Sequence, residues 1–308
     1  MEASNPRQSM NDGWRSVLQL ANVGNPVTRG GVSLFPVFTQ DHDVRPVRAG
    51  VDATTDRSVE LREREDGQVP TLIATSTSAV PVLFPQGDTV VGGLQNRTLN
   101  VSVLLEAGVT MIPVSCVEVG RCCGTRDFEH GSTLAPRRVR RVTSDSVAHH
   151  VRADHSRHSD QGAVWSAIDG ELHRTGTHSA NSAVHDIYRE ANGYADELAD
   201  LGPLPDQTGV VVTRGARVLG VEVFGTPQLL ERYWRPIIGS YRVDIGREGR
   251  GYPSATRALR FLDRIARTES TEEAGVGLGR EHHFRTDRFV AHALTWDDDL
   301  VHLAGFAR

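Results

Sequence analysis

Hydrophobic and polar positions alternate along parts of the first half of this chain. Between residues 98 and 105 every second side chain is apolar, starting at Leu99 and ending at Leu105. A period of two predicts a strand with one buried face, and shorter apolar runs nearby are typical of buried strands. The strands predicted in this half are 32–38, 80–84, 98–105 and 109–118.

The short segment Glu106-Ala107-Gly108 separates the last two predicted strands. A connection of this length that contains glycine favours a β-hairpin. If the turn is centred on Ala107, antiparallel pairing places Asn96 opposite Glu118 and Thr98 opposite Cys116. A slip of one residue would exchange the two faces of the hairpin.

Apolar residues in the second half recur at helical spacing. The predicted helical stripes run over residues 164–172, 184–198, 229–241 and 259–265, and the strands predicted among them are 209–213, 218–224, 289–294 and 300–303. Thr226 followed by Pro227 is a favourable helix start, and Ser254 is a second candidate N-cap. Pro236 predicts a kink within its helix.

Two polar stretches lack a clear period. Residues 52–67 and the Arg-, His- and Ser-rich residues 136–160 are therefore predicted to be loops. The chain is predicted to be α+β, with mainly antiparallel sheets and amphipathic helices concentrated in the C-terminal half. Residues 1–30 are interpreted as a tail and lead-in. Residues 31–308 are interpreted as one large domain that can divide into a strand-rich lobe (31–135) and a mixed lobe (160–308), joined by the loop 136–160.

Composition narrows the function classes. Hydrophobic residues make up 38% of the 308 residues, which is enough to form a core. The net charge is −5, which argues against a protein that binds nucleic acids. All 34 cationic residues are arginine, so mechanisms that need a lysine are excluded. Neither a secretory signal nor a membrane-spanning run is recognisable, so a cytoplasmic location is expected. Three clustered cysteines are neither a disulfide framework nor a regular zinc motif, and no metal is predicted.

The open end of the predicted hairpin is the candidate site. It would gather six polar or thiol side chains: Gln95, Asn96, Arg97, Cys116, Glu118 and Arg121. Arginines hold phosphate oxygens through paired hydrogen bonds, amides orient a ligand, and a carboxylate can transfer protons or contact a metal. Glu118 is thus the candidate catalytic residue, and the other five are candidate ligand-binding residues.

Structural alternatives stay open for these residues. One of the two arginines could pair with Glu118 to neutralise a buried charge. Cys116 is better explained as a small buried thiol than as a nucleophile, because Arg121 follows it by five positions and not by the six of cysteine phosphatases. His302, near the end of the last strand, is either a polar member of the site or a hydrogen-bonded core histidine.

Gln95-Asn96-Arg97 and Cys116-Val117-Glu118-Val119-Gly120-Arg121 resemble the core of the ARG and rhodanese-phosphatase-superfamily-associated domain family. The likeness extends through 161–165, 218–241, 275–280 and 301–303, and so covers most of residues 30–308. Similar sequences tend to have an aromatic residue after the Gly-Arg pair, where this chain has Cys122 and Cys123.

The resemblance implies an association with enzymes that handle ADP-ribose, NAD-derived nucleotides and phosphate esters. The expected function is binding of an ADP-ribose-like or NAD-derived nucleotide, with hydrolysis of a phosphoester or glycosidic bond as the reaction to test. The alternative is a noncatalytic module that docks on an ADP-ribose-handling or phosphatase enzyme. Neither a nucleic acid nor a membrane is an expected partner, and no cofactor is specified.

Overall fold

The computed structural model describes residues 13–40, 45–64, 70–119, 127–189 and 192–308. These residues form seven α-helices, one short 3₁₀ helix and 18 strands, and nearly all strand pairs are antiparallel. The prediction of an α+β fold is confirmed. Among the described residues, no helix is both long and apolar enough to cross a membrane.

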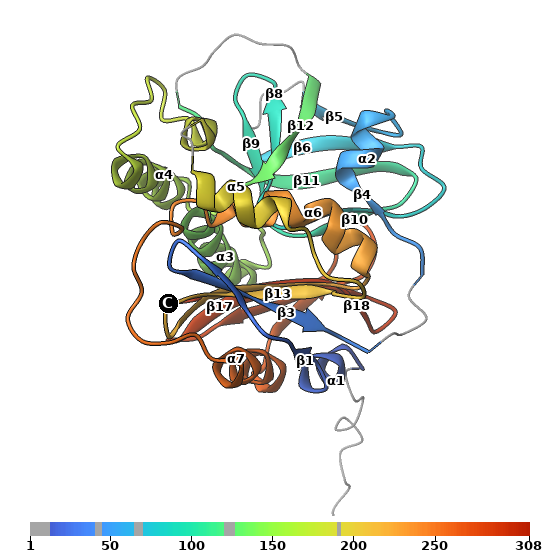
Figure 1. Ribbon diagram of the computed structural model, residues 1–308. Coiled ribbons are helices and arrows are strands. Elements are labelled where there is room, and N and C mark those ends of the chain that lie inside the picture. The colour runs from blue at the N-terminus through green and yellow to red at the C-terminus, as the bar shows by residue number, and fades with distance from the viewer. Residues whose placement is uncertain (1–12, 41–44, 65–69, 120–126, 190–191) are drawn as a thin grey trace, which may run out of the picture.

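A nine-stranded sheet forms one layer of the molecule (Figure 1). Its order is β1-β3-β13-β14-β18-β17-β16-β15, with β2 paired to β3. The bounds are β1 Asn22–Val23, β2 Val27–Arg29, β3 Val32–Phe38, β13 Gly209–Arg214, β14 Arg217–Phe224, β15 Thr271–Ala274, β16 Arg280–Arg285, β17 Phe289–Trp296 and β18 Asp299–Ala307.

A closed six-stranded barrel lies above this sheet in Figure 1. Its order is β11-β6-β5-β12-β8-β9, and a separate three-stranded sheet has the order β10-β7-β4. The bounds are β4 Arg48–Ala49, β5 Val59–Glu63, β6 Thr71–Ser76, β7 Val82–Phe84, β8 Asp88–Gly92, β9 Arg97–Leu99, β10 Val103–Leu105, β11 Gly108–Cys116 and β12 Asp127–Leu134.

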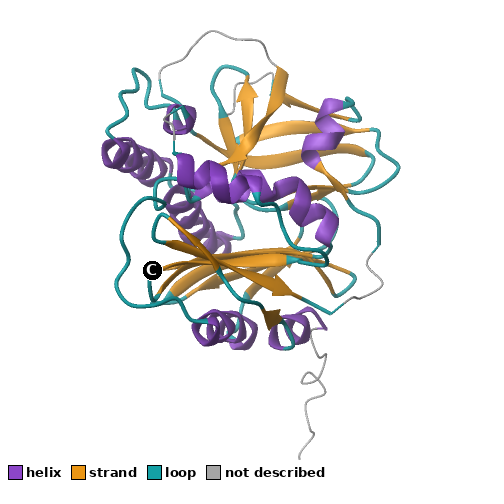
Figure 2. Ribbon diagram, viewed as in Figure 1, coloured by secondary structure: helices purple, strands orange, loops and turns teal. Residues whose placement is uncertain are grey.

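Helices cover both faces of the large sheet (Figure 2). α1 and α7 pack on the outer face, whereas α3, α5 and α6 lie between the sheet and the barrel. The bounds are α1 Gly13–Gln19, α2 Gly50–Thr55, α3 Arg137–Asp154, α4 Gln161–Thr175, η1 Val184–Tyr188, α5 Gly193–Asp200, α6 Pro227–Ser240 and α7 Ala255–Arg267.

The tyrosine at the centre of α6 ties this helix to the barrel side of the molecule. The hydroxyl of Tyr233 donates to the carbonyl of Leu83 at 2.8 Å and accepts from the N–H of Gly50 at 2.9 Å. Its ring also stacks on Phe224 of the large sheet. Because a buried hydroxyl needs such partners, α6 is fixed against both layers at once.

Several predicted elements are confirmed and others are wrong. Strand 32–38 has the predicted bounds, and α6 begins after Thr226, whose side chain accepts from the N–H of Leu229. Residues 136–160 are not a loop: most of them form α3. Residues 52–67 contain part of α2 and all of β5, and the stripe 184–198 is split between η1 and α5.

The predicted hairpin is also wrong. Residues 103–105 form β10, which pairs with β7, and the first part of β11 pairs with β6. Only β9 pairs with the end of β11, so Arg97 lies opposite Cys116 and Ser115 opposite Thr98, one residue from the predicted register. The chain leaves β11 at residues 100–102 because Ser102 bonds elsewhere, to Gln86 and His292.

Candidate functional site

Arg97 is buried and ion-paired at the end of β9. Only 3% of its side chain is exposed. Its guanidinium donates to Glu63 at 3.1 Å and to the carbonyl of Gln95 at 2.9 Å. The arginine predicted to hold phosphate therefore neutralises a carboxylate of β5, and Glu63 was not identified from the sequence.

Glu118 is buried close to Asn96, as predicted, and two of its contacts are with neutral groups of described residues. One oxygen accepts from the N–H of Asn96 at 3.2 Å and the other accepts from the side chain of Asn181. The side chain of Asn96 accepts from the N–H of Gly92 at 3.1 Å. Arg97 pairs with Glu63 and not with Glu118, while Arg121 lies outside the described residues.

Cys116 is a buried thiol with its backbone held on both sides. Gln161 accepts from its N–H and donates to its carbonyl, each at 2.9 Å, and the sulfur lies 3.2 Å from the side-chain oxygen of Gln95. Burial raises the pKa of the Cys116 thiol. A protonated thiol is a weak nucleophile, so these contacts favour the structural interpretation.

His302 lies apart from these residues, on the face of the large sheet that is turned toward α3. Its Nε2 lies 3.1 Å from a carboxylate oxygen of Glu222, and its Nδ1 lies 2.7 Å from the hydroxyl of Ser102. Because Glu222 only accepts, the ring proton belongs on Nε2 and Ser102 donates to Nδ1. Burial lowers the pKa of His302, which keeps the ring neutral.

A buried arginine completes this cluster. Arg140 of α3 binds both oxygens of Glu222, at 2.6 and 3.2 Å, and its Nε donates to Gln86. Burial alone would raise the pKa of Glu222, but Arg140 and His302 hold it below its usual value. The ion pair between Arg140 and Glu222 joins α3 to the sheet. The side chains of Arg140, Glu222 and His302 do not reach solvent.

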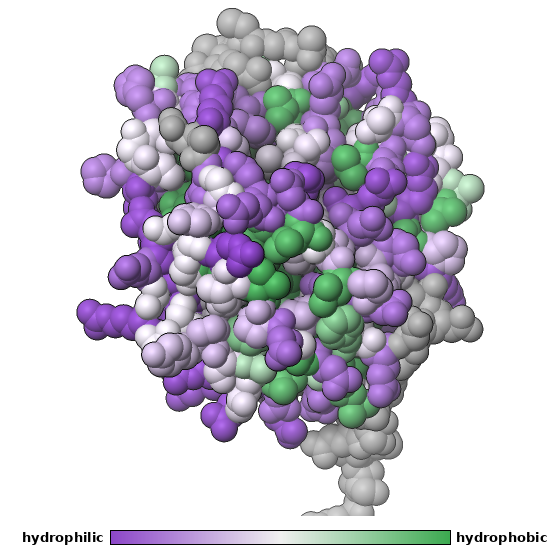
Figure 3. Space-filling view, viewed as in Figure 1, coloured by the Kyte–Doolittle hydropathy of each residue, from purple (hydrophilic) through white to green (hydrophobic). Residues whose placement is uncertain are grey.

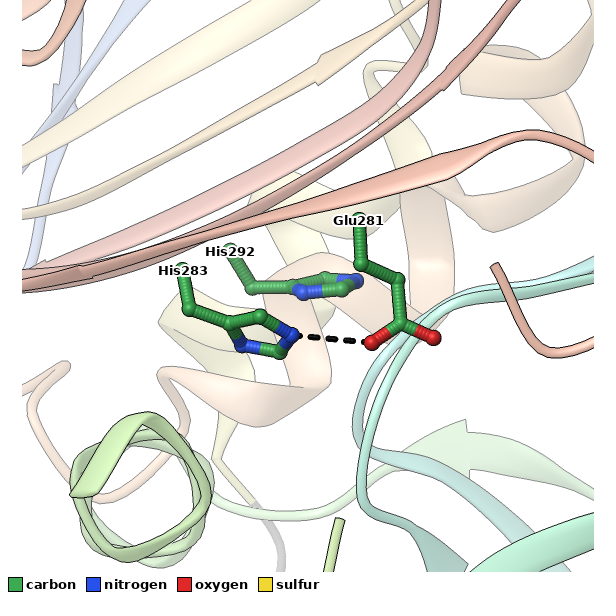
Figure 4. Close-up of side chains that lie close together, drawn as sticks. All are labelled: Glu281, His283 and His292. Atoms are coloured by element: carbon green, nitrogen blue, oxygen red, sulfur yellow. Dashed lines mark hydrogen bonds and ion pairs between the residues drawn. The ribbon is translucent and has the colours of Figure 1, made fainter. Parts of the chain in front are cut away.

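Ser102 connects His302 to a second buried group on the same sheet face. Its N–H donates to Nε2 of His292 at 3.0 Å, and His292 lies directly opposite His283 on the neighbouring strand. Nε2 of His283 lies 2.8 Å from Glu281 (Figure 4). Together the two buried groups contain Glu222, Glu281, His283, His292 and His302. Of these five residues, only His302 was identified from the sequence.

The structure contains an open cavity of about 520 Å³ between α3, the start of α4 and the end of β16. Arg141, Asp145, His149, His150 and Arg285 are among its lining residues. None of them was predicted to form a site, because residues 136–160 were interpreted as a loop. The helical spacing of Arg141, Asp145 and His149 places these side chains on one face of α3.

Arg141 lines this cavity without a direct ion pair to another described residue. It is half-buried and forms no hydrogen bond or ion pair with any described residue. The charge of Asp145 raises the pKa of Arg141, but this carboxylate accepts hydrogen bonds from Arg285 at 2.8 Å and from Arg308. Burial lowers the pKa of Arg141, and the charges of Arg137, Arg308 and Arg217 lower it further. An anion in the cavity would relieve this repulsion.

A larger groove of about 800 Å³ lies beside α2 and β12, and several of its charged groups are already paired. Nε2 of His130 lies 2.8 Å from Asp88, and its Nδ1 accepts from the N–H of Ser132. Arg62 pairs with Glu60 and Asp127. Both nitrogens of His130 are engaged, so the ring is held as a structural group.

Taken together, the fold and buried clusters define an α+β protein in which a closed barrel is joined to a large antiparallel sheet through helices and buried ion pairs. The family model of the ARG and Rhodanese-Phosphatase-superfamily-associated Protein domain matches residues 21–306, and the chain belongs to this family. No curated protein and no solved structure shows a significant match to it.

Proposed function

We propose that the protein binds a phosphate-bearing nucleotide of the ADP-ribose or NAD-derived kind in the cavity between α3, α4 and β16. The observation that carries the proposal is the guanidinium of Arg141, which has no ion-pair or hydrogen-bond partner in the part of the chain that the structure describes. Arginine binds phosphate groups through paired, charge-assisted hydrogen bonds. The proposal moves the ligand away from residues 95–118, where Arg97 pairs with Glu63 and Glu118 accepts from Asn96 and Asn181.

The size and lining of the cavity support such a ligand. A volume of about 520 Å³ lies within the usual range for small-molecule sites, roughly 300–1,000 Å³. Arg285 supplies a second guanidinium at the rim, although Asp145 shares it. His149 and His150 offer flat rings on which a base can stack. The ADP-ribose class comes from the family resemblance, and a cytoplasmic location is part of the same proposal.

Calorimetric titration of the full chain with ADP-ribose, NAD and inorganic pyrophosphate tests this function. Arg141→Gln is expected to weaken binding about 10- to 100-fold, since one hydrogen bond to a charged group is lost. The variant should keep or raise the melting temperature, because a cation among like charges is removed. Arg235→Gln, which alters an exposed ion pair on α6, is the matched control. Absence of binding at millimolar ligand would overturn the proposal.

A noncatalytic docking module is the second candidate. Tyr194, Leu201 and Leu204 are each more than half exposed on or just after α5. Hydrophobic residues gather around the middle of the face shown in Figure 3, whereas most of that face is hydrophilic. Exposed apolar groups of this kind favour protein contacts. Under this proposal, Leu201→Asp abolishes association with a co-purifying enzyme, and Arg141→Gln leaves it unchanged.

A further inference from the structure

We propose that Glu281, His283 and His292 bind a single transition-metal dication of the Zn²⁺ class between the large sheet and α3. Their ligand atoms all lie within 4.8 Å of one another, and all three residues are buried. Figure 4 shows both imidazole rings directed toward the carboxylate of Glu281. Two nitrogens and one carboxylate oxygen suit Zn²⁺, Co²⁺ or Ni²⁺ better than Mg²⁺ or Ca²⁺.

Strand geometry holds the three ligands together. Glu281 and His283 are two residues apart on β16, so their side chains share one face of the sheet. His292 is the cross-strand partner of His283 on β17. Both strands lie inside the sheet, with β15 and β18 as their outer neighbours, which makes this face rigid. Ligands on paired central strands are positioned more firmly than ligands on loops.

Further groups orient the ligands. The N–H of Val276 donates to Oε1 of Glu281 at 3.1 Å, which leaves Oε2 on the side of His283. The N–H of Ser102 points at Nε2 of His292 and therefore keeps the ring proton on Nδ1. The lone pair of His292 is thus on Nε2, and a metal ion bound there takes the place of the Ser102 N–H. Hydrogen-bonded outer residues of this kind are a regular part of metal sites.

Arg157 competes with the proposed ion. Its Nε lies 3.2 and 3.4 Å from the two oxygens of Glu281, longer than a strong charge-assisted bond. Its side chain is 21% exposed and follows the end of α3. A dication replaces the hydrogen bond between His283 and Glu281, and the proton of the neutral His283 ring moves from Nε2 to Nδ1 so that Nε2 can bind the ion. Removing the charge of Arg157 should therefore tighten metal binding.

Co²⁺ titration of the tag-free, chelator-treated full chain tests the site through visible absorption. One equivalent is expected to bind, and Zn²⁺ should displace it. Glu281→Gln and His292→Asn should each weaken binding at least 100-fold, whereas Arg157→Gln should strengthen it several-fold. His282→Asn, a neighbour on the opposite sheet face against Trp14, is the matched control and should retain one equivalent.

Circular dichroism of each variant separates loss of a ligand from loss of the fold. Stoichiometric Co²⁺ uptake by folded wild type that disappears in folded Glu281→Gln establishes the site. Absence of uptake, or uptake that Glu281→Gln and His292→Asn leave unchanged, overturns the proposal. Because the titration contains no nucleotide, and Arg141→Gln should bind Co²⁺ normally, its outcome is independent of the proposed nucleotide function.

Discussion

At the scale of single residues, the ion pair between Arg97 and Glu63 distinguishes a structural role from a ligand-binding role. Both side chains are almost fully buried, and they join two strands that are not neighbours in the barrel. Burying two charges is costly, so such a pair contributes little net stability, yet removal of one partner leaves the other charge uncompensated.

Arg97→Gln is expected to lower the free energy of unfolding by about 3–5 kcal/mol, the usual cost of breaking a buried pair. Arg235→Gln is the control, because Arg235 and Asp200 are 69% and 65% exposed. An exposed pair is worth about 0–1 kcal/mol. Urea denaturation measures the free energy of unfolding of both variants. If Arg97→Gln proved as mild as the control and also weakened nucleotide binding, Arg97 would be a ligand residue after all.

At the scale of elements, the sequence was most informative where one face of a strand or helix is uniformly apolar. Residues 32–38 are almost all buried between α1 and α7 on one side and α5 and α6 on the other, and their apolar run predicted β3 correctly. Helix α3 was missed because its buried face includes Arg137, Arg140, Thr143 and Ser144. These polar residues conceal the helical period, and their partners are distant in sequence.

Prediction of the candidate site was limited in the same way, by partners that are distant in sequence. Proximity of Asn96 and Glu118 followed from local chain geometry and is found in the structure. The partner of Arg97 could not be predicted, since Glu63 lies on a different strand within a segment interpreted as a loop. The two strands that carry His283 and His292 were only partly predicted, because β16 has polar residues on its buried face.

The two predicted helix starts differ in the structure and can be compared directly. The hydroxyl of Thr226 accepts from the N–H of Leu229 at 3.3 Å, whereas Ser254 makes no side-chain cap bond. Thr226→Ala is therefore expected to cost about 1 kcal/mol of stability, and Ser254→Ala clearly less. Thermal unfolding of the two variants checks this difference. Equal losses would mean that Ser254 forms its cap bond in solution.

At the scale of the whole molecule, buried ionisable groups predict lower stability in acid. Burial lowers the pKa of His302 and of His185 below 6.5. Below about pH 6.5 the unfolded chain therefore binds protons that the folded chain does not, and stability falls as the pH falls. Glu222, with a lowered pKa, adds a further loss below about pH 4.5. His130 acts in the opposite direction, because Asp88 outweighs burial and raises its pKa.

Denaturant midpoints between pH 8 and pH 5 measure this dependence. Each buried neutral histidine contributes a slope of up to about 1.4 kcal/mol per pH unit. His302→Gln is expected to flatten the curve below pH 6.5, even if it lowers stability at pH 8. A curve that rises toward pH 5, or one that His302→Gln leaves unchanged, would contradict the assignment of a neutral buried ring.

The pairing of β3 with β13 has a consequence for how the protein is made. Val37 lies opposite Gly209, so more than half the chain length separates the two strands. At about 5–20 residues per second, the ribosome needs roughly 10 to 35 seconds between them. During that interval the apolar β3 has no strand beside it on the β13 side. Until the second half has been translated, this edge of β3 is therefore open to pairing with other chains.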